Sequence, residues 1–269
     1  MPITQPHQFF GRRQIVKRLF NLLKTHPLQN AAIIGPRRSG KTSLLNYLRT
    51  ITTTPASQLR PGQRADWLPQ PEAYCWVYVD FQDARLARRE GLLRHLLVSM
   101  GLGVPEPCSL ERFMERVSGL QRPTVVLMDE VGVGLQRCPE LDDGFWESLR
   151  SLATTQTGGN LAFVLATPES PMTLAQHTGH SSPFFNIFGY TKNLGPLKEA
   201  EARELVGRSP IPFAEADVAW ILERSGGWPI LLQVLCRERL VALEDGDTSD
   251  DWRQEGLEQM QPFMHLLDA

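Results

Sequence analysis

The chain has 269 residues, of which 42% are hydrophobic and 22% are charged, and its formal net charge is −2. This composition is typical of a soluble globular protein with a sizeable core, and the length allows one large domain or a core domain with a smaller attachment. No apolar run approaches the roughly 18 residues that a membrane-spanning helix needs, and the N-terminus lacks the apolar segment of a signal peptide. We therefore expect a cytoplasmic protein with no membrane partner.

The charges are unevenly distributed along the chain. Residues 1–65 contain no Asp or Glu, but they contain eleven Lys and Arg residues. Such asymmetry suits a part of the molecule that meets polyanions. Nucleotide phosphates account for part of it, and nucleic acid is an open explanation for the remainder.

The strongest motif lies at 31–45, with the sequence AAIIGPRRSGKTSLL. An apolar run is followed by G-x-x-x-x-G-K-T and then by helical spacing, which matches a phosphate-binding loop between a strand and a helix. The two glycines permit backbone conformations in which successive N–H groups point at phosphate oxygens. Lys41 would lie along the β- and γ-phosphates, and the Thr42 hydroxyl would ligate Mg²⁺. We predict that ATP or ADP is held by Gly35, Pro36, Arg37, Arg38, Ser39, Gly40, Lys41, Thr42 and Ser43.

Five apolar or β-branched runs predict a buried parallel sheet, at 31–34, 74–81, 124–129, 160–167 and 184–194. The third run ends in Asp129 and Glu130, and a buried parallel strand delivers such residues to the carboxyl edge of the sheet, where the phosphate loop also lies. Asp129 fits the role of a Mg²⁺-holding carboxylate, and Glu130 is placed to polarise an attacking water as a general base. Asp80, at the end of the second run, either lies near the metal or caps the segment that follows.

Helical spacing is found before the first strand and after each of the first three. The predicted helices begin near Ile15, at 39–51, at 88–100, at 109–120 and near Phe145. Residues 52–71 break all periodicity and contain four prolines, which predicts a long exposed insertion with either a partner-binding role or no function beyond connection.

Two flanking motifs, Phe10-Gly11-Arg12 and Gly227-Trp228-Pro229, complete a resemblance to the STAND-class ATPases and their archaeal, origin-recognition and AAA+ relatives. The resemblance implies that Phe10, Gly11 and Arg12 contact the base or the phosphates, and that Trp228 and Pro229 contact adenine and ribose. It also implies that Thr167 senses the γ-phosphate and that a helical lid follows Leu-Gly-Pro-Leu at 194–197, with nucleotide between lid and sheet edge. For Arg150, two roles stay open: a contact with a neighbouring subunit's γ-phosphate, or an ordinary exposed helix position.

We predict an α/β P-loop NTPase fold with a five-stranded parallel sheet of order 5-1-4-3-2 and a small C-terminal helical lid. The predicted domains are an ATPase core at 1–195, with an N-terminal helix and the insertion at 52–72, and the lid at 196–243. Residues 244–269 would form an acidic linker and a terminal helix.

The leading functional hypothesis is a molecular switch that binds Mg-ATP, hydrolyses it slowly and assembles with itself or with protein partners. Its catalytic residues would be Lys41, Asp129, Glu130 and Thr167, and its metal ligands Thr42 and Asp129. The alternative is a DNA-associated AAA+-like ATPase of the replication-initiator or transposition-helper kind, which would use the acid-free N-terminal part of the chain on phosphate backbones. A third hypothesis is a nucleotide-binding scaffold that never turns over.

Overall fold

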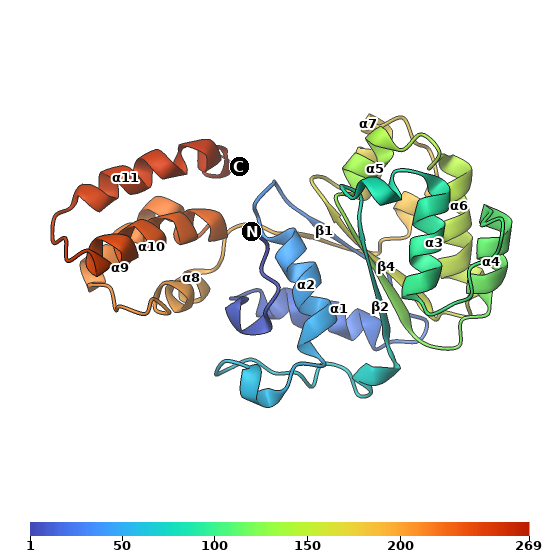
Figure 1. Ribbon diagram of the computed structural model, residues 1–269, viewed down its shortest axis with the longest axis horizontal. Coiled ribbons are helices and arrows are strands. Elements are labelled where there is room, and N and C mark those ends of the chain that lie inside the picture. The colour runs from blue at the N-terminus through green and yellow to red at the C-terminus, as the bar shows by residue number, and fades with distance from the viewer. Residues whose placement is uncertain (269) are drawn as a thin grey trace. The chain divides into compact units, whose positions relative to one another are not determined.

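The computed structural model describes residues 1–268, which fold into two compact units (Figure 1). The first contains Met1–His7, Gln14–Gly35 and Lys41–Asn193. The second contains Gln8–Arg13, Pro36–Gly40 and the chain from Leu194 onward. The tip of the phosphate loop is thus assigned to the second unit, whereas the two residues that flank the tip belong to the first.

A five-stranded parallel sheet forms the centre of the first unit. Its strands are β1 (Ala31–Ile34), β2 (Cys75–Asp80), β3 (Thr124–Asp129), β4 (Leu161–Thr167) and β5 (Tyr190–Asn193). Their order is β2-β3-β4-β1-β5, which confirms the predicted order 5-1-4-3-2. Every residue of β3 and β4 is buried, as expected for parallel strands that are covered on both faces.

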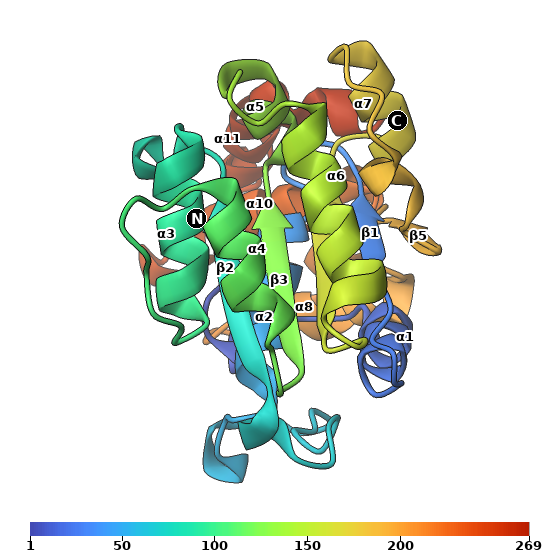
Figure 2. The same ribbon diagram turned by 90° about the vertical axis from the view of Figure 1, so that its right-hand side faces the viewer.

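Helices cover the two faces of this sheet (Figures 1 and 2). On one face lie α1 (Arg13–Leu23) and α2 (Lys41–Ile51), and on the other lie α3 (Arg89–Ser99), α4 (Leu110–Ser118) and α6 (Asp143–Ser151). In the core beneath α3, α4 and α6, the ring centroid of Trp146 lies 5.2 Å from the ring centroids of Phe184 and Phe185. Both phenylalanines belong to a 3-10 helix at Pro183–Asn186, so the predicted strand at 184–194 is wrong in its first half.

Two further helices were not predicted, α5 (Val131–Arg137) and α7 (Pro171–His177). Helix α5 contains Gly132 and Gly134, and glycine is unfavourable inside a helix. The structure gives Gly134 a packing reason, because a Cβ there would lie 2.5 Å from the Phe81 ring. A glycine inside this helix therefore permits close contact with the residue that follows β2.

The insertion at 52–72 is anchored rather than wholly exposed, which corrects the sequence-based prediction. It contains 3-10 helices at Ala56–Gln58 and Pro71–Ala73. Between them the Trp67 ring stacks on Phe20 of α1 with centroids 5.4 Å apart, and Leu68 is buried. The Gln63 side chain also donates a hydrogen bond of 2.6 Å to the Pro6 carbonyl oxygen.

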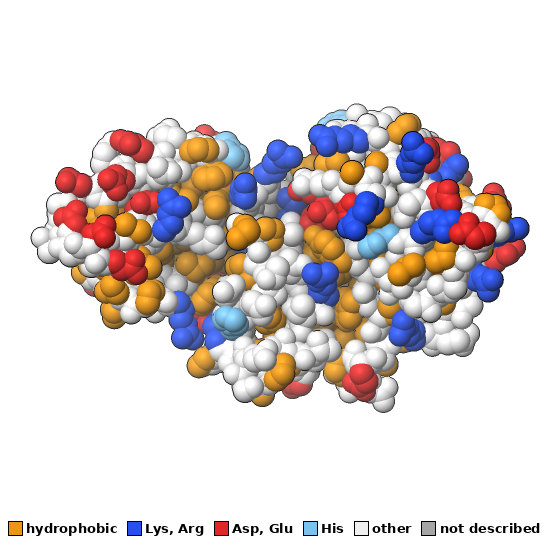
Figure 3. Space-filling view, in the orientation of Figure 1, with side chains coloured by type: hydrophobic (Ala, Val, Ile, Leu, Met, Phe, Trp, Pro, Cys, Tyr) orange, Lys and Arg blue, Asp and Glu red, His pale blue; other side chains and the backbone are white. Residues whose placement is uncertain are grey.

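The second unit is helical, with α8 (Glu199–Val206), α9 (Glu215–Ser225), α10 (Pro229–Glu244) and α11 (Asp251–Met260). Helix α11 and the 3-10 helix Gln261–Leu266 share one core with α8, α9 and α10, through the buried Trp252, Met260 and Leu266. The predicted linker and helix at 244–269 therefore contribute to the packing of this unit through the residues up to 268 that the structure describes. Acidic side chains gather on its face in Figure 3. No helix within residues 1–268 is both long and apolar enough to cross a bilayer.

An ionic cluster around the buried Asp217 connects three of these helices. The Asp217 carboxylate of α9 lies 2.8 Å from Arg239 Nε of α10 and 3.0 Å from Arg253 Nη2 of α11. Both guanidinium groups lie about 5 Å from the Trp252 ring centroid, at 5.3 and 5.5 Å. Arg253 Nη1 also lies 3.2 Å from Asp250 Oδ2, and the aromatic face adds a further favourable contact for both positive charges.

Candidate nucleotide-binding site

The carboxyl ends of β1, β3 and β4 meet at one edge of the sheet. Ile34 pairs with Thr167, and Met128 pairs with Leu165, so Asp129 leaves β3 at the level where β1 and β4 end. The Gly35 N–H then donates a hydrogen bond of 3.1 Å to the Thr167 carbonyl oxygen. In parallel α/β proteins this edge is where ligands bind.

The loop between β1 and α2 contains a glycine with positive φ and a buried polar residue. Gly40 adopts a φ of +97°, a conformation that side chains rarely adopt. Ser39 is 1% exposed, and its hydroxyl has no hydrogen-bond partner in the part of the chain that the structure describes. Arg37 and Arg38 are exposed, and the Arg38 guanidinium lies 5.9 Å from the Phe263 ring centroid. A buried hydroxyl without a partner costs free energy, and a bound phosphate oxygen would supply the missing acceptor.

Lys41 and Thr42 begin α2, directly after the loop. Lys41 is only 8% exposed, and its Nζ donates a hydrogen bond of 2.7 Å to the Gly35 carbonyl oxygen, so the ammonium group is held over the loop. The hydroxyl of Ser43, also predicted to bind the nucleotide, accepts a hydrogen bond of 3.0 Å from the Ile3 N–H. Ser43 therefore also fixes the N-terminal segment on α2.

Asp129 is 2% exposed, and both of its carboxylate oxygens accept hydrogen bonds. Tyr78 Oη donates to Oδ2 at 2.9 Å, and the Glu130 N–H donates to Oδ1 at 3.0 Å. Burial, followed by the nearby Asp129 carboxylate, raises the pKa of Tyr78, so the hydroxyl remains a donor across the physiological range. Each oxygen of Asp129 keeps a second lone pair for a water or a metal ion.

Glu130 has a left-handed backbone, with φ 53° and ψ 40°, and precedes the first residue of α5. Its half-buried carboxylate makes no hydrogen bond or ion pair within residues 1–268. A non-glycine residue in this region is strained by roughly 1–3 kcal/mol, and such residues cluster at functional sites. The conformation turns the chain sharply after β3 and leaves the Glu130 carboxylate available as a proton acceptor.

Two other polar residues lie at this edge. Thr167 is fully buried, and its hydroxyl donates a hydrogen bond of 2.7 Å to the Glu169 carbonyl oxygen. It can still accept one, so its predicted role as a γ-phosphate sensor stays a prediction. Asp80 pairs in register with Asp129, and its Oδ1 accepts a hydrogen bond from the Gln82 N–H at 2.9 Å, as expected of the capping alternative.

The donor set fits a nucleotide-borne Mg²⁺ better than an ion held by protein alone. No group of three or more His, Cys, Asp or Glu side chains in residues 1–268 is arranged to hold a metal ion. Thr42 and Asp129 provide one hydroxyl and one carboxylate. Mg²⁺ usually binds through one or two protein oxygens plus phosphate oxygens and waters, so these residues match that arrangement.

The Gly-Arg motif near the N-terminus is folded into the second unit. Gly11 has a φ of +70°, and a Cβ there would lie 2.8 Å from Glu201 Oε2. Arg12, whose φ is 61°, is 8% exposed, and its guanidinium donates hydrogen bonds to the carbonyl oxygens of Gly195 and, at 2.9 Å, Pro196. Burial lowers the pKa of Arg12 to about 10, an effect that the Glu201 carboxylate partly offsets. Arg12 therefore holds the segment between β5 and α8, and Phe10 beside it is half-buried.

The Gly-Trp-Pro motif also has a structural use. Pro229 begins α10, where its missing N–H costs nothing. The Gly227 carbonyl oxygen accepts a hydrogen bond of 2.8 Å from the Leu197 N–H, and a Cβ on Gly227 would lie 2.8 Å from the Leu197 oxygen. Trp228 is 5% exposed and packs in the core of the helical unit. Gly227 therefore permits a close approach to the 194–197 segment, and the buried Trp228 offers a ligand little surface.

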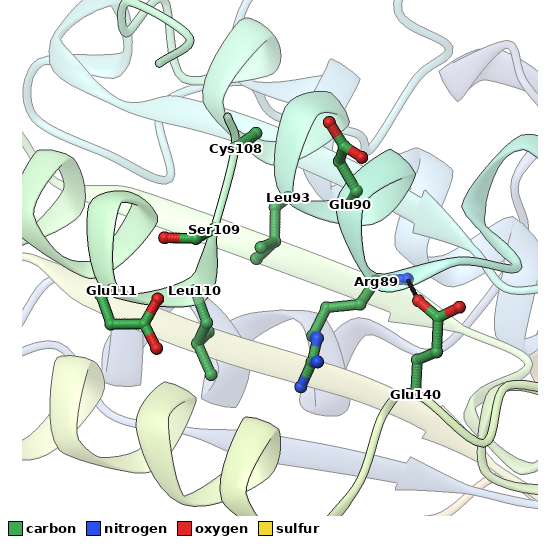
Figure 4. A pocket seen from close by; sticks show the side chains of 8 residues that line it. All are labelled: Arg89, Glu90, Leu93, Cys108, Ser109, Leu110, Glu111 and Glu140. Atoms are coloured by element: carbon green, nitrogen blue, oxygen red, sulfur yellow. Dashed lines mark hydrogen bonds between the residues drawn. The ribbon is translucent and has the colours of Figure 1, made fainter. Parts of the chain in front are cut away.

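Figure 4 shows a cavity of about 300 Å³ elsewhere in the first unit, beside α3 and the start of α4. Its charged lining consists of Arg89, Glu90, Glu111 and Glu140, and the Arg89 N–H donates a hydrogen bond of 3.0 Å to Glu140. None of the lining residues belongs to a predicted motif. Arg150, near the end of α6, is exposed, and both of its proposed roles stay open.

No protein-family model matches the chain, and no curated protein matches its sequence. Solved structures do match it. A Walker-type ATPase of Pyrococcus abyssi matches with a TM-score of 0.68 at 17% identity, over 98% of this chain and 76% of that one. The ORC2 protein of Aeropyrum pernix, solved as ADPNP–ADP complexes, gives 0.62 at 14% identity over 93% and 69%.

Domain III of the replication initiation protein DnaA of Thermotoga maritima gives a TM-score of 0.59 at 16% identity, over 98% of both chains. At such identities the likeness concerns the fold. Together with the strand order and the loop between β1 and α2, it defines the chain as an α/β protein with a P-loop NTPase fold.

Two residues at this edge were not predicted from the sequence: Tyr78, whose hydroxyl contacts Asp129, and Arg49, whose guanidinium lies against the Tyr78 ring. The sequence pattern predicts Tyr78 only as a β-forming residue of the second strand. One signal was available: Tyr78 alternates with buried valines and lies two residues before the strand ends at Asp80. This places a polar ring tip on the same side of the sheet as a strand-end carboxylate.

The second unit offers a test of what Arg12 does. We expect Arg12→Met to lower the free energy of unfolding by about 2 kcal/mol, because the carbonyls of Gly195 and Pro196 lose a charged donor. The neighbouring Arg13→Met, at an exposed position, should change it by less than about 0.5 kcal/mol. Urea unfolding followed by tryptophan fluorescence measures both. Equal losses in the two variants would show that the hydrogen bonds of Arg12 do not stabilise the unit.

Proposed function

We propose that this protein is a Mg-ATP-dependent molecular switch, which binds ATP, hydrolyses it slowly and assembles with itself or with protein partners according to the nucleotide bound. The observation that carries the proposal is the arrangement at one sheet edge. Lys41 is held over the loop after β1, and a buried Asp129 lies at the end of β3. Beside it is the Glu130 carboxylate, which has no partner within residues 1–268. The likeness to solved ATPases with this fold supports it.

In this proposal the loop from Gly35 to Ser43 binds the triphosphate with its backbone N–H groups, and Lys41 adds a compact positive charge. The Ser39 hydroxyl, which has no hydrogen-bond partner among the described residues, donates to a phosphate oxygen. Thr42 and Asp129 hold Mg²⁺, which supplies charge neutralisation when bound. Thr167 senses the γ-phosphate from the end of β4.

Glu130 accepts a proton from the attacking water on its carboxylate. Within residues 1–268 this carboxylate makes no ion pair or hydrogen bond, so both of its oxygens are able to accept the proton. By contrast, the Asp129 oxygens are occupied by Tyr78 and by the Glu130 N–H, which suits a carboxylate that positions rather than one that takes up protons. The two neighbouring acids would thus have different tasks.

Lys41→Ala tests nucleotide binding. We expect the substitution to abolish ATP binding at micromolar concentrations, because the ammonium group at the loop is lost. The control is Lys17→Ala on the exposed face of α1, which removes the same charge outside the loop. Calorimetric titration with ATP measures both, and circular dichroism confirms that the variants fold. Micromolar affinity in Lys41→Ala would refute the assignment of the loop.

Glu130→Gln tests turnover and the switch together. The variant should bind ATP as the wild type does and release phosphate at least about 100-fold more slowly. If the wild type assembles with ATP and disassembles as the ATP is hydrolysed, Glu130→Gln should stay assembled. Phosphate release and light scattering after size exclusion measure the two effects, with the exposed Glu147→Gln as control. Identical phosphate release from wild type and Glu130→Gln would favour the scaffold that never turns over.

A DNA-associated ATPase is the second candidate, and the charge of the first 65 residues favours it. Lys17 and Arg18 on α1 are exposed, and neither forms an ion pair with any carboxylate of the described chain. Arg18 instead lies 5.8 Å from the Tyr190 ring centroid. Cations that are not neutralised internally are available to phosphate backbones.

Binding to duplex DNA across a salt series distinguishes the candidates. If α1 contacts DNA, the double variant Lys17→Gln/Arg18→Gln should weaken binding and reduce the slope of log K against log salt by about 1 to 2. Arg116→Gln/Arg137→Gln removes two exposed charges elsewhere in the first unit and serves as control. No binding of the wild type at low salt would remove this candidate.

A further inference from the structure

Tyr78 reaches Asp129 across two neighbouring strands. Tyr78 pairs in register with Leu127, and Asp129 lies two residues further along β3, on the same side of the sheet. Diagonal neighbours of this kind are within reach of an aromatic side chain. The Tyr78 hydroxyl accordingly lies 2.9 Å from Asp129 Oδ2.

The Tyr78 ring is itself held in place by α2. The Arg49 guanidinium lies 4.8 Å from the ring centroid, and α2 begins at Lys41, so one helix carries both the loop residues and this contact. On the backbone side, His95 Nε2 of α3 lies 2.8 Å from the Tyr78 carbonyl oxygen. Helix α2 therefore holds the Tyr78 ring through Arg49, and α3 holds the backbone of β2 at Tyr78 through His95.

The orientation of the Asp129 carboxylate is set from both oxygens. Oδ2 accepts from Tyr78 and Oδ1 accepts from the Glu130 N–H at 3.0 Å, so rotation of the group would break a hydrogen bond on either side. Functional groups need such supporting partners to stay within about 0.5 Å of their working geometry.

We infer that Tyr78 is a positioning residue for Asp129: its hydroxyl fixes the carboxylate in the orientation that receives Mg²⁺, and Arg49 fixes the Tyr78 ring. This inference rests on the proposed function, because it concerns the metal that accompanies the nucleotide. It adds a residue of β2 to a site otherwise built from the ends of β1, β3 and β4.

A competing effect gives the opposite sign. A donor on Oδ2 withdraws charge from the carboxylate, so a hydroxyl that only competed with the metal would weaken Mg²⁺ binding, and its removal would tighten it. Because Asp129 is buried and each oxygen keeps a free lone pair, we expect the loss of orientation to outweigh the gain in charge.

The test is Tyr78→Phe, with Tyr74→Phe as matched control. Tyr74 directly precedes β2, and its hydroxyl donates a hydrogen bond of 2.9 Å to the Leu23 carbonyl oxygen, away from Asp129. Binding of a fluorescent, non-hydrolysable ATP analogue is titrated with Mg²⁺. We expect Tyr78→Phe to raise the Mg²⁺ concentration at half-saturation about tenfold, with affinity in excess EDTA unchanged, and Tyr74→Phe to match the wild type.

A second measurement needs neither metal nor nucleotide. The urea midpoints of Tyr78→Phe, Asp129→Asn and the double variant form a cycle, and we expect the double variant to lose less than the sum of the single losses. Additive losses, or an unchanged or lowered Mg²⁺ midpoint in Tyr78→Phe, would overturn the inference while leaving the proposed function intact. Wild-type protein whose nucleotide affinity did not depend on Mg²⁺ would overturn the proposed function and this inference together.

Discussion

The hydrogen bond from the Gly35 N–H to the Thr167 carbonyl oxygen carries the β1–β4 pairing one residue beyond β1. The Phe81 N–H does the same for β2 and β3, by donating to the Asp129 carbonyl oxygen at 3.2 Å. The ladders thus remain paired up to the residue where the phosphate loop and the Asp129-Glu130 segment leave the sheet. A slip by one residue would turn each buried side chain to the other face, so the packing of both faces fixes where the polar residues emerge.

Strain is concentrated where the chain leaves regular structure. Within residues 1–268 the non-glycine residues with positive φ are Arg12, Arg38 and Glu130. The first two lie in motifs predicted to bind the nucleotide, and Glu130 is the predicted general base. Arg12 is held by two carbonyl oxygens, and the Glu130 N–H is held by Asp129. Conformations of this kind cost about 1–3 kcal/mol each and persist only when their surroundings impose them.

Much of the fold could be predicted because buried parallel strands consist of continuous apolar runs of sequence. The run that ends in Asp129 is the clearest example. The loop could be predicted because phosphate binding restricts residue types at fixed spacing. Helix α5 could not, because Gly134 suggests a turn until the Phe81 ring beside it is known. The insertion at 52–72 is anchored by the stacking of Trp67 on Phe20. These residues are 47 positions apart, so no local sequence pattern predicts their contact.

The Gly-Arg and Gly-Trp-Pro motifs, which the resemblance assigns to nucleotide contact, also have structural roles in this chain. Arg12 donates to the carbonyls of Gly195 and Pro196, and Gly227 accepts from the Leu197 N–H, so both motifs hold the same short segment after β5. A guanidinium has five donors, so these bonds leave Arg12 some capacity for a further acceptor. Its 8% exposure and lowered pKa nevertheless show that most of its surface is already committed to protein. The spacing that marks these motifs is therefore accounted for, at least in part, by the backbone geometry of the 194–197 segment, before any ligand is considered.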